Sequence, residues 1–207
     1  MQRFHLEILS DAQKEVLKTL AHFGAHGILG GGTALTLQLK HRKSYDFDLF
    51  YSSEIQESLF LAINKRFEHI SIIVNTLDEL SFITQSGVKV SFISYPFAPL
   101  FDAIEQEGMR FFSWRDIALD KAYTIGRRSE WRDYIDLYAV IKNGFALADI
   151  VSNAKKKFGR VFSEKLFLSQ LYYSSDLKDF SVEFINEEIT PGDLKSFFEQ
   201  EIKRITR

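Results

Sequence analysis

The sequence predicts an α/β (α+β) fold, in which helices flank a mixed β-sheet and a helical C-terminal half packs against it. As far as Tyr95, segments with the two-residue period of strands alternate with helical segments, whereas beyond Pro99 the period is mostly helical. The last strand-like segments of the first half follow one another directly, which argues against an all-parallel sheet. We therefore expect a mixed-sheet core over residues 1–105 and a helical region over residues 106–207, with both contributing to one site.

The elements of the first half follow from caps, turns and alternation. Ser10 caps a helix that runs to Phe23. The elements expected after it are a short buried strand at 27–30, a helix after the glycines, a strand at 44–49, a helix at 53–67, and strands at 69–75, 80–84 and 88–95. Residues 85–87 join the last two strands in a hairpin, and Pro96 and Pro99 are expected to end the sheet.

The second half is predicted to be helical. Residues 114–126 and 129–143 form two helices separated by a short basic turn, and the stretch 146–179 has a helix at each end. Thr190, with Pro191 at the first helical position and an aspartate three residues after the cap, starts the last helix.

One segment indicates chemistry more strongly than the rest of the chain. Residues 30–50 read GGGTALTLQLKHRKSYDFDLF, and near their end polar and apolar residues alternate. On a strand, this alternation places Ser44, Asp46 and Asp48 on one face. Residues two apart on a strand lie roughly 6.5–7 Å from each other, near enough for both carboxylates to ligate a pair of divalent cations.

The glycines at the start of this segment suit a phosphate. Backbone N–H groups at a helix N-terminus can cradle an anion, and Gly31 and Gly32 allow it to approach closely. Thr33 adds a hydroxyl donor. Each part alone has a plainer interpretation, since a glycine pair is usually a tight turn and an Asp-x-Asp strand is more often a solvated face. The glycines fit neither the Walker loop nor the Rossmann spacing.

The same residues carry a resemblance to a known family. Three short runs share its signature: Gly31-Gly32-Thr33-Ala34, His41-Arg42 and Ser44-x-Asp46-x-Asp48-Leu49-Phe50. They resemble the AbiEii/AbiGii toxin family of nucleotidyltransferases, a branch of the polymerase-β-like superfamily. Two later runs, residues 116–121 and 132–138, are similar to the family's lysine and aspartate motifs, so the resemblance covers most of the chain.

The resemblance implies a magnesium-dependent enzyme that transfers a nucleoside monophosphate from a nucleoside triphosphate to an acceptor. A two-metal site is expected, with Mn²⁺ as an alternative metal, and the acceptor in relatives that act as toxins is the 3′ end of tRNA. The resemblance also implies a toxin of a toxin–antitoxin or abortive-infection system, with a cognate antitoxin protein as partner.

The resemblance further assigns roles to residues. Triphosphate oxygens would be held by Gly31, Gly32, Thr33, Arg42, Ser44 and Lys121. Magnesium would be held by Asp46 and Asp48. Lys121 would act in catalysis with these two aspartates, and Asp136 would complete the site. Asp133 is the second choice for that last role, because it lies one helical turn from Asp136 and both could face the cleft.

One position departs from the superfamily pattern. A third carboxylate is expected on a neighbouring strand, and the strand at 88–95 has Ser91 there. Three explanations remain open: the helix aspartate substitutes for it, the acceptor is activated by metal, or catalysis is impaired. A second hypothesis is therefore a nucleotide-binding or regulatory protein without turnover. A third is nucleotidyl transfer to a small molecule or to a protein side chain.

Composition agrees with an ordinary globular enzyme. With 207 residues, 45% of them hydrophobic, the chain can bury a sizeable core, and with no cysteine it has neither a disulfide framework nor a thiolate metal site. No signal peptide or membrane-length apolar run is evident, so we expect a cytoplasmic protein without a membrane partner. The net charge of −2 does not indicate a nucleic-acid binder, although basic residues cluster locally at 40–43, 127–128, 155–160 and 203–207.

Overall fold

The chain forms two compact units. The computed structural model describes residues 4–25, 27–128, 130–173, 177 and 179–205. One unit comprises Met1–Gln38 and Ser44–Ser113, and the other comprises Leu39–Lys43 and Trp114–Arg207. The polypeptide thus enters the second unit for a short stretch, returns to the first, and enters the second again at Trp114.

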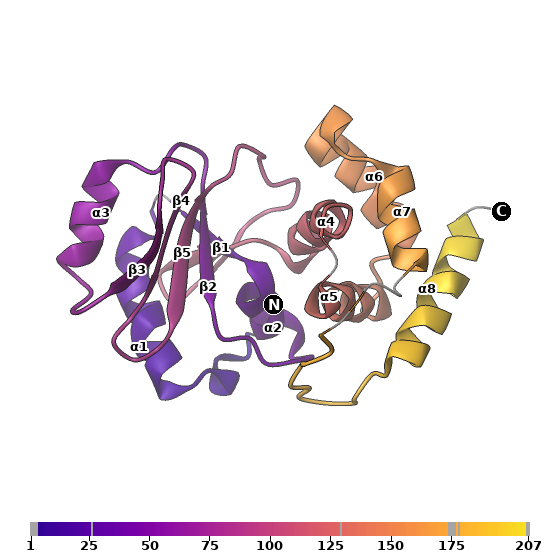
Figure 1. Ribbon diagram of the computed structural model, residues 1–207, viewed down its shortest axis with the longest axis horizontal. Helices are drawn as coiled ribbons and strands as arrows, with labels where there is room; N and C mark the ends of the chain where they lie inside the picture. The colour runs from indigo at the N-terminus through magenta and orange to yellow at the C-terminus, as the bar shows by residue number, and fades with distance from the viewer. Residues whose placement is uncertain (1–3, 26, 129, 174–176, 178, 206–207) are drawn as a thin grey trace. The chain divides into compact units, whose positions relative to one another are not determined.

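A mixed sheet forms the centre of the first unit (Figure 1). The strands of its described part are β1 (Ile28–Gly30), β2 (Phe47–Tyr51), β3 (Ser71–Asn75), β4 (Glu79–Ile83), β5 (Lys89–Ser94), β6 (Ile104–Gln106) and β7 (Met109–Phe111). Their order is β3-β4-β5-β2-β1-β7-β6. The β2–β5 and β1–β7 pairs are parallel and the other pairs are antiparallel, which confirms the predicted mixed α/β fold.

Short helices accompany the sheet. They are η1 (Leu6–Ile8), α1 (Asp11–Leu20), η2 (Ala21–Phe23), α2 (Gly31–Leu39) and α3 (Glu57–Asn64). Ser10 and Gln13 form a reciprocal capping box at the start of α1, so the predicted cap is confirmed. The helix expected to begin at residue 53 starts later, at Glu57.

Alternating burial fixes which face of β2 meets the core. Phe47, Leu49 and Tyr51 are buried, whereas Asp48 and Phe50 are half-buried. The pairing of β2 with β5 continues this apolar face to Phe92, whose ring packs edge-on against Phe23. The aspartate therefore lies on the face opposite the one that Phe47 and Leu49 bury.

The structure corrects two expectations about strands. The sheet does not end at Pro96 and Pro99, because the β6–β7 hairpin rejoins it through the parallel pairing of Leu29 with Phe111. The strand expected at 44–49 begins only at Phe47, so Ser44 and Asp46 lie in the segment before β2.

The second unit is helical. Its elements are α4 (Trp114–Ile125), α5 (Trp131–Lys142), α6 (Leu147–Phe158), η3 (Gly159–Val161), α7 (Glu164–Tyr172) and α8 (Pro191–Ile205). Helix α4 packs against α5, α6 and α7, and α8 packs against α7 (Figure 1). Thr190 and Asp193 hydrogen-bond reciprocally at the start of α8, which confirms the predicted start signal. The predicted helix start at residue 129 lies outside the described residues.

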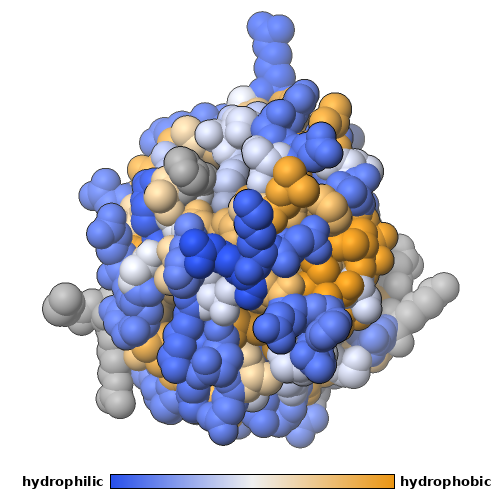
Figure 2. All heavy atoms as spheres, turned by 90° about the vertical axis from the view of Figure 1, so that its left-hand side faces the viewer, coloured by the Kyte–Doolittle hydropathy of each residue, from blue (hydrophilic) through white to orange (hydrophobic). Residues whose placement is uncertain are grey.

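The edge strand β3 presents apolar side chains to solvent. Ile72 and Ile73 are 43% and 51% exposed, and Leu61 of α3 is also exposed. Figure 2, turned so that this end of the first unit faces the viewer, shows apolar side chains gathered on one part of the face among polar ones. None of the helices in the described ranges is long and apolar enough to cross a membrane.

Candidate functional site

The glycine turn at the start of α2 lies in close contact with an aspartate of β2. Gly30 ends β1 and pairs with Asp48 in the β1–β2 ladder. Gly31 opens α2 with φ of +67°, a left-handed conformation that glycine adopts without strain. A Cβ on Gly31 would collide with a carboxylate oxygen of Asp48. The carboxylate therefore lies at the start of α2, where the first backbone N–H groups have no partner within the helix.

Two side chains hold the segment before β2. Thr33, which is buried, hydrogen-bonds the carbonyl of Asp46, and its Oγ1 lies 2.9 Å from Ser44 Oγ. The side-chain amide of Gln13 donates to the carbonyl of Ser44 at 2.9 Å. This segment, and with it Asp46, is consequently tied to both α1 and α2. The sequence analysis gave Ser10 as the cap of this helix and did not identify Gln13.

The strand next to Asp48 carries no acid at the matching position. Asp48 and Ser91 are register partners in the parallel β2–β5 pair, and Ser91 in turn pairs with Ser81 of β4. Paired residues of neighbouring strands project from the same face of the sheet. The Ser81 hydroxyl donates to the Glu79 carboxylate at 2.5 Å. The predicted departure from the superfamily pattern therefore lies directly beside Asp48.

The magnesium site predicted for Asp46 and Asp48 would share its ligands with a nucleotide. Mg²⁺ is commonly bound by one or two carboxylates plus substrate phosphates, and not by a cage of protein ligands. Within the described part of the chain, no group of three or more histidine, aspartate or glutamate side chains could hold a metal. Asp48, whose carboxylate lies against the glycine turn, fits such an incomplete donor set, and the role of Asp46 beside it stays a prediction.

In the second unit, three cationic or hydrogen-bonding side chains contact one buried carboxylate. Asp136, fully buried on α5, accepts from His41 Nε2 at 2.8 Å and from Arg42 Nε and Nη2 at 2.6 and 2.9 Å. Lys121 Nζ of α4 lies 2.7 Å from Asp136 and 2.5 Å from Asp133. We call these five residues the Asp136 network.

The ionisation states follow from this arrangement. Burial alone would raise the pKa of Asp136, but the charges of Arg42 and Lys121 and the hydrogen bonds hold it well below its ordinary value. Burial opposes protonation of Lys121, yet Asp136 and Asp133 raise its pKa above the ordinary value. Burial lowers the pKa of His41 more than Asp136 raises it, so His41 is neutral near pH 7.

Arg42 and Lys121, the two cations that were predicted to bind triphosphate, are paired with carboxylates of the network. All three guanidinium nitrogens of Arg42 hydrogen-bond, two to Asp136 and Nη1 to the carbonyl of Lys43 at 2.8 Å. Lys121 lies between two carboxylates. His41 was not among the predicted site residues, although its Nε2 binds Asp136. His41 Nδ1 and Asp133 Oδ2 are buried without a hydrogen-bond partner among the described residues.

The predicted site residues thus fall into two groups. Gly31, Gly32, Thr33, Ser44, Asp46 and Asp48 belong to the first unit, and Arg42, Lys121, Asp133 and Asp136 belong to the second. The structure brings Gly31 and Asp48 together, ties Thr33 to Ser44 and Asp46, and joins all four residues of the second group. A common site made of both groups stays a prediction.

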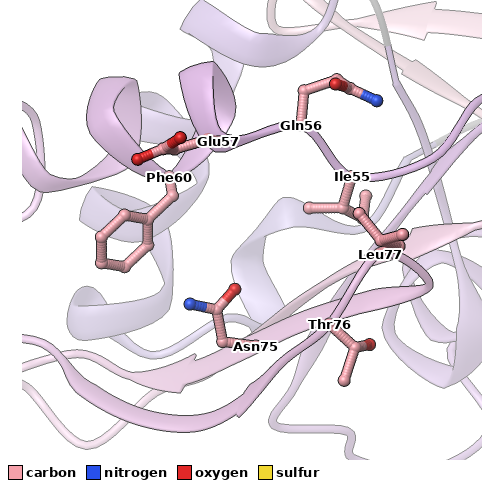
Figure 3. Close-up of a pocket in the computed structure, with 7 residues that line it drawn as sticks. All are labelled: Ile55, Gln56, Glu57, Phe60, Asn75, Thr76 and Leu77. Carbon is pink, nitrogen blue, oxygen red and sulfur yellow. The ribbon is translucent and has the colours of Figure 1, made fainter.

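A cavity in the first unit lies away from these residues. It has a volume of about 430 Å³ and is lined by Ile55, Gln56, Glu57, Phe60, Asn75, Thr76 and Leu77 (Figure 3). Glu57 is the one charged residue of this lining, and no cation lines it. The cavity therefore has no group suited to a triphosphate, and it includes none of the predicted site residues.

The mixed sheet and its helices have the fold of nucleotidyltransferases whose structures are solved. The fold of this chain is similar to that of MenT4, a nucleotidyltransferase toxin of Mycobacterium tuberculosis, with a TM-score of 0.64 and 15% identity over 94% of this chain and 82% of that one. A candidate nucleotidyltransferase from H. pylori is also similar, with a TM-score of 0.58 and 20% identity over 96% and 98% of the two chains.

The chain belongs to the AbiEii family, described as the nucleotidyl transferase AbiEii toxin of type IV toxin–antitoxin systems, whose model matches residues 15–206. The family resemblance drawn from the motifs is thereby confirmed. An uncharacterized protein of Aquifex aeolicus is 30% identical over 206 aligned positions, and the match covers 94% of this chain and 96% of that protein.

Proposed function

We propose that this nucleotidyltransferase moves a nucleoside monophosphate from a nucleoside triphosphate to the 3′ end of a tRNA, with magnesium held by Asp46 and Asp48. One observation supports this above all: the Asp48 carboxylate lies so close to Gly31 that a side chain there would collide with it. The proposed metal ligand is thus adjacent to the backbone donors of the glycine turn. As a toxin, the protein would act in cells that lack the cognate antitoxin.

Residues of the first unit would bind the triphosphate and its metal. N–H groups at the start of α2 would bind phosphate oxygens, with Gly31 and Gly32 allowing close approach. Ser44 would add a hydroxyl, and Thr33 would position the segment that carries Asp46. Bound metal, as a pair of Mg²⁺ or Mn²⁺ ions, would supply positive charge at the α-phosphate.

The Asp136 network would contribute charge and rigidity. The raised pKa of Lys121 keeps its ammonium protonated, as a partner for the triphosphate must be. The lowered pKa of Asp136 keeps this carboxylate ionised, so it can fix Arg42 and Lys121. Asp136 would complete the site in this way, with Asp133 as the second choice.

The experiment is transfer from each of four α-labelled nucleoside triphosphates to total tRNA in the presence of magnesium. We expect labelled tRNA with the native chain and none with Asp46→Asn. Asp102→Asn is a matched control, because Asp102 is an exposed aspartate of the same unit. Undiminished transfer by Asp46→Asn would remove the proposed metal site. Omitting magnesium, or replacing it with Mn²⁺, tests the metal requirement in the same assay.

Ser91 beside Asp48 favours a second candidate, a nucleotide-binding regulatory protein without turnover. Calorimetric titration with triphosphate distinguishes the two functions. Binding without pyrophosphate release, across a panel of RNA, protein and small-molecule acceptors, would support the regulatory function. Pyrophosphate release that depends on a non-RNA acceptor would instead support the enzymatic function, with that acceptor in place of tRNA.

A further inference from the structure

The turn between α4 and α5 carries a fixed guanidinium layer that the proposed chemistry does not use. The Arg127 guanidinium carbon lies 3.5 Å from the centroid of the Tyr123 ring. On its other face, the Tyr123 ring stacks on Phe158 with centroids 4.5 Å apart and an interplanar angle of 22°. The three side chains therefore form successive layers, with Arg127 outermost and exposed.

Two hydrogen bonds fix the outermost layer. Arg127 Nη1 donates to the carbonyl of Tyr123 at 3.1 Å, and Nη2 donates to the carbonyl of Val161 in η3 at 2.8 Å. An exposed arginine usually samples many rotamers, and ordering it costs free energy. Here that cost is met within the protein, so the charged group is already ordered when a ligand arrives.

Two exposed cations belong to the segments that contact this turn. Arg160 precedes the residue whose carbonyl holds Arg127, and Lys165 lies in the first turn of α7. The next residue of α7, Leu166, lies close to Gly126 at the end of α4. Arg160 and Lys165 are exposed, and neither forms an ion pair with a residue in the described ranges.

Helix dipoles explain only some of these charges. Lys155–Lys157 lie in the last turn of α6, where cations are favourable, and Lys155 also pairs with Glu164. Lys165, in contrast, lies in the first turn of α7, where a positive charge opposes the helix dipole. The dipole of α7 therefore does not account for its position.

An exposed aromatic ring lies on the same face of α7 as Lys165. Lys165 and Tyr172 are seven residues apart on α7, so they share one face at a separation of about 10 Å. Tyr172 and Tyr173 are 42% and 65% exposed, and their rings lie 5.0 Å apart. The surface thus combines cations with exposed aromatic and guanidinium planes.

We propose that this surface, defined by Arg127, Arg160, Lys165 and Tyr172, binds an unpaired segment of RNA. A base stacks on the outer face of the Arg127 guanidinium or on Tyr172, and Arg160 and Lys165 contact backbone phosphates. An acidic protein would use the charges but would have no need of ordered planes. That the RNA is the acceptor rests on the proposed function, whereas binding itself does not.

The test is fluorescence anisotropy with a labelled RNA hairpin that ends in a single-stranded 3′ tail, without nucleotide or metal. Arg127→Lys keeps the charge and removes the plane, and we expect it to weaken binding about tenfold. The double variant Arg160→Ala/Lys165→Ala should reduce the slope of log K against log salt by about 1.4. Lys65→Ala, which removes an exposed lysine of the first unit, should leave affinity and slope unchanged.

A blunt hairpin of equal charge separates stacking from charge alone. We expect it to bind at least tenfold more weakly than the tailed hairpin and to show no difference between native chain and Arg127→Lys. Equal affinity for both RNAs, or unchanged binding in the variants, overturns the proposal. The proposal is also overturned if the native chain binds an acidic protein but does not bind RNA.

The outcome does not depend on turnover. Asp46→Asn should bind the tailed hairpin as the native chain does, because the metal site is in the other unit. Loss of binding in the Arg127 and Arg160/Lys165 variants, with no transfer by the native chain, would uphold the surface and reject the enzyme function. Transfer to tRNA by the native chain, with unaltered RNA binding in those variants, would uphold the enzyme function and reject the surface. Matching thermal melts of each variant and the native chain exclude unfolding as the cause.

Discussion

Replacing Gly31 with alanine separates the cost to the fold from the cost to the site. The substitution forces a side chain into a left-handed conformation, with φ of +67°, which costs about 1–2 kcal/mol. It also sets a methyl group against the Asp48 carboxylate, which must move. For a chain of this length the first effect lowers the melting temperature by about 2–8 °C. The second should abolish magnesium-dependent binding of triphosphate and nucleotide transfer.

Gly87→Ala is the matched control. Gly87 lies in the β4–β5 hairpin of the same unit, has φ of +81°, and has nothing within 4 Å of the position its Cβ would take. Alanine there meets the same conformational strain without a collision. We therefore expect a similar fall in melting temperature, with transfer and triphosphate binding retained.

The assays are differential scanning calorimetry for stability and isothermal titration with triphosphate and magnesium for the site. Gly31→Ala protein that melts like Gly87→Ala yet binds triphosphate as tightly as the native chain would refute the reasoning. It would mean that Asp48 can move aside without loss of metal, and hence that its position against the glycine turn is incidental.

Three further substitutions test the supporting contacts. Thr33→Val keeps the shape and removes the hydroxyl, so it should cost about 1–2 kcal/mol of stability in urea unfolding and raise the KM for triphosphate. Asp136→Ala leaves the buried Arg42 and Lys121 without their shared carboxylate, and should cost about 3–5 kcal/mol by the same measurement. His41→Gln keeps a donor for the carboxylate and removes the titration. Because burial lowers the pKa of His41, the native chain should lose stability as pH falls below about 6.5, and the variant should lose less.

Each of these has an outcome that contradicts it. An unchanged KM for Thr33→Val would leave the segment before β2 held by other contacts alone. A loss below 1 kcal/mol for Asp136→Ala would show that the two cations reach solvent. Parallel stability curves for His41→Gln and the native chain from pH 8 to 5 would place the titrating group elsewhere.

Caps and tight turns made much of the fold predictable. The Ser10 and Thr190 caps confirm two helix starts at the expected residues, and the hairpin at 85–87 joins β4 and β5 as expected. The β6–β7 hairpin was missed because strands of three residues have too little alternation to detect. Its turn, Glu107-Gly108, has positive φ at both residues, but glutamate is not the asparagine or aspartate that usually marks such a turn.

The sequence predicted a set of candidate site residues but not the contacts between them. Spacing and family resemblance selected Arg42, Lys121, Asp133 and Asp136 as candidates. The bidentate pairing of Arg42 with Asp136 joins residues 94 positions apart, and no local pattern encodes it. The role of Gln13 was hidden for another reason. Its side chain completes a cap with one atom and holds the Ser44 carbonyl with another, and only the first contact has a sequence signature.

The short return of the chain through Leu39–Lys43 limits how the protein can be divided. A fragment beginning at Trp114 would keep both buried aspartates of α5 but would retain only Lys121 from the Asp136 network to balance them. A fragment ending at Ser113 would expose Arg42 without its carboxylate. Neither unit can therefore be expressed as one continuous stretch of sequence with its charges balanced. A working split version would require residues 39–43 to be grafted onto the helical piece, and a premature stop near Ser113 would leave Arg42 without the Asp136 carboxylate.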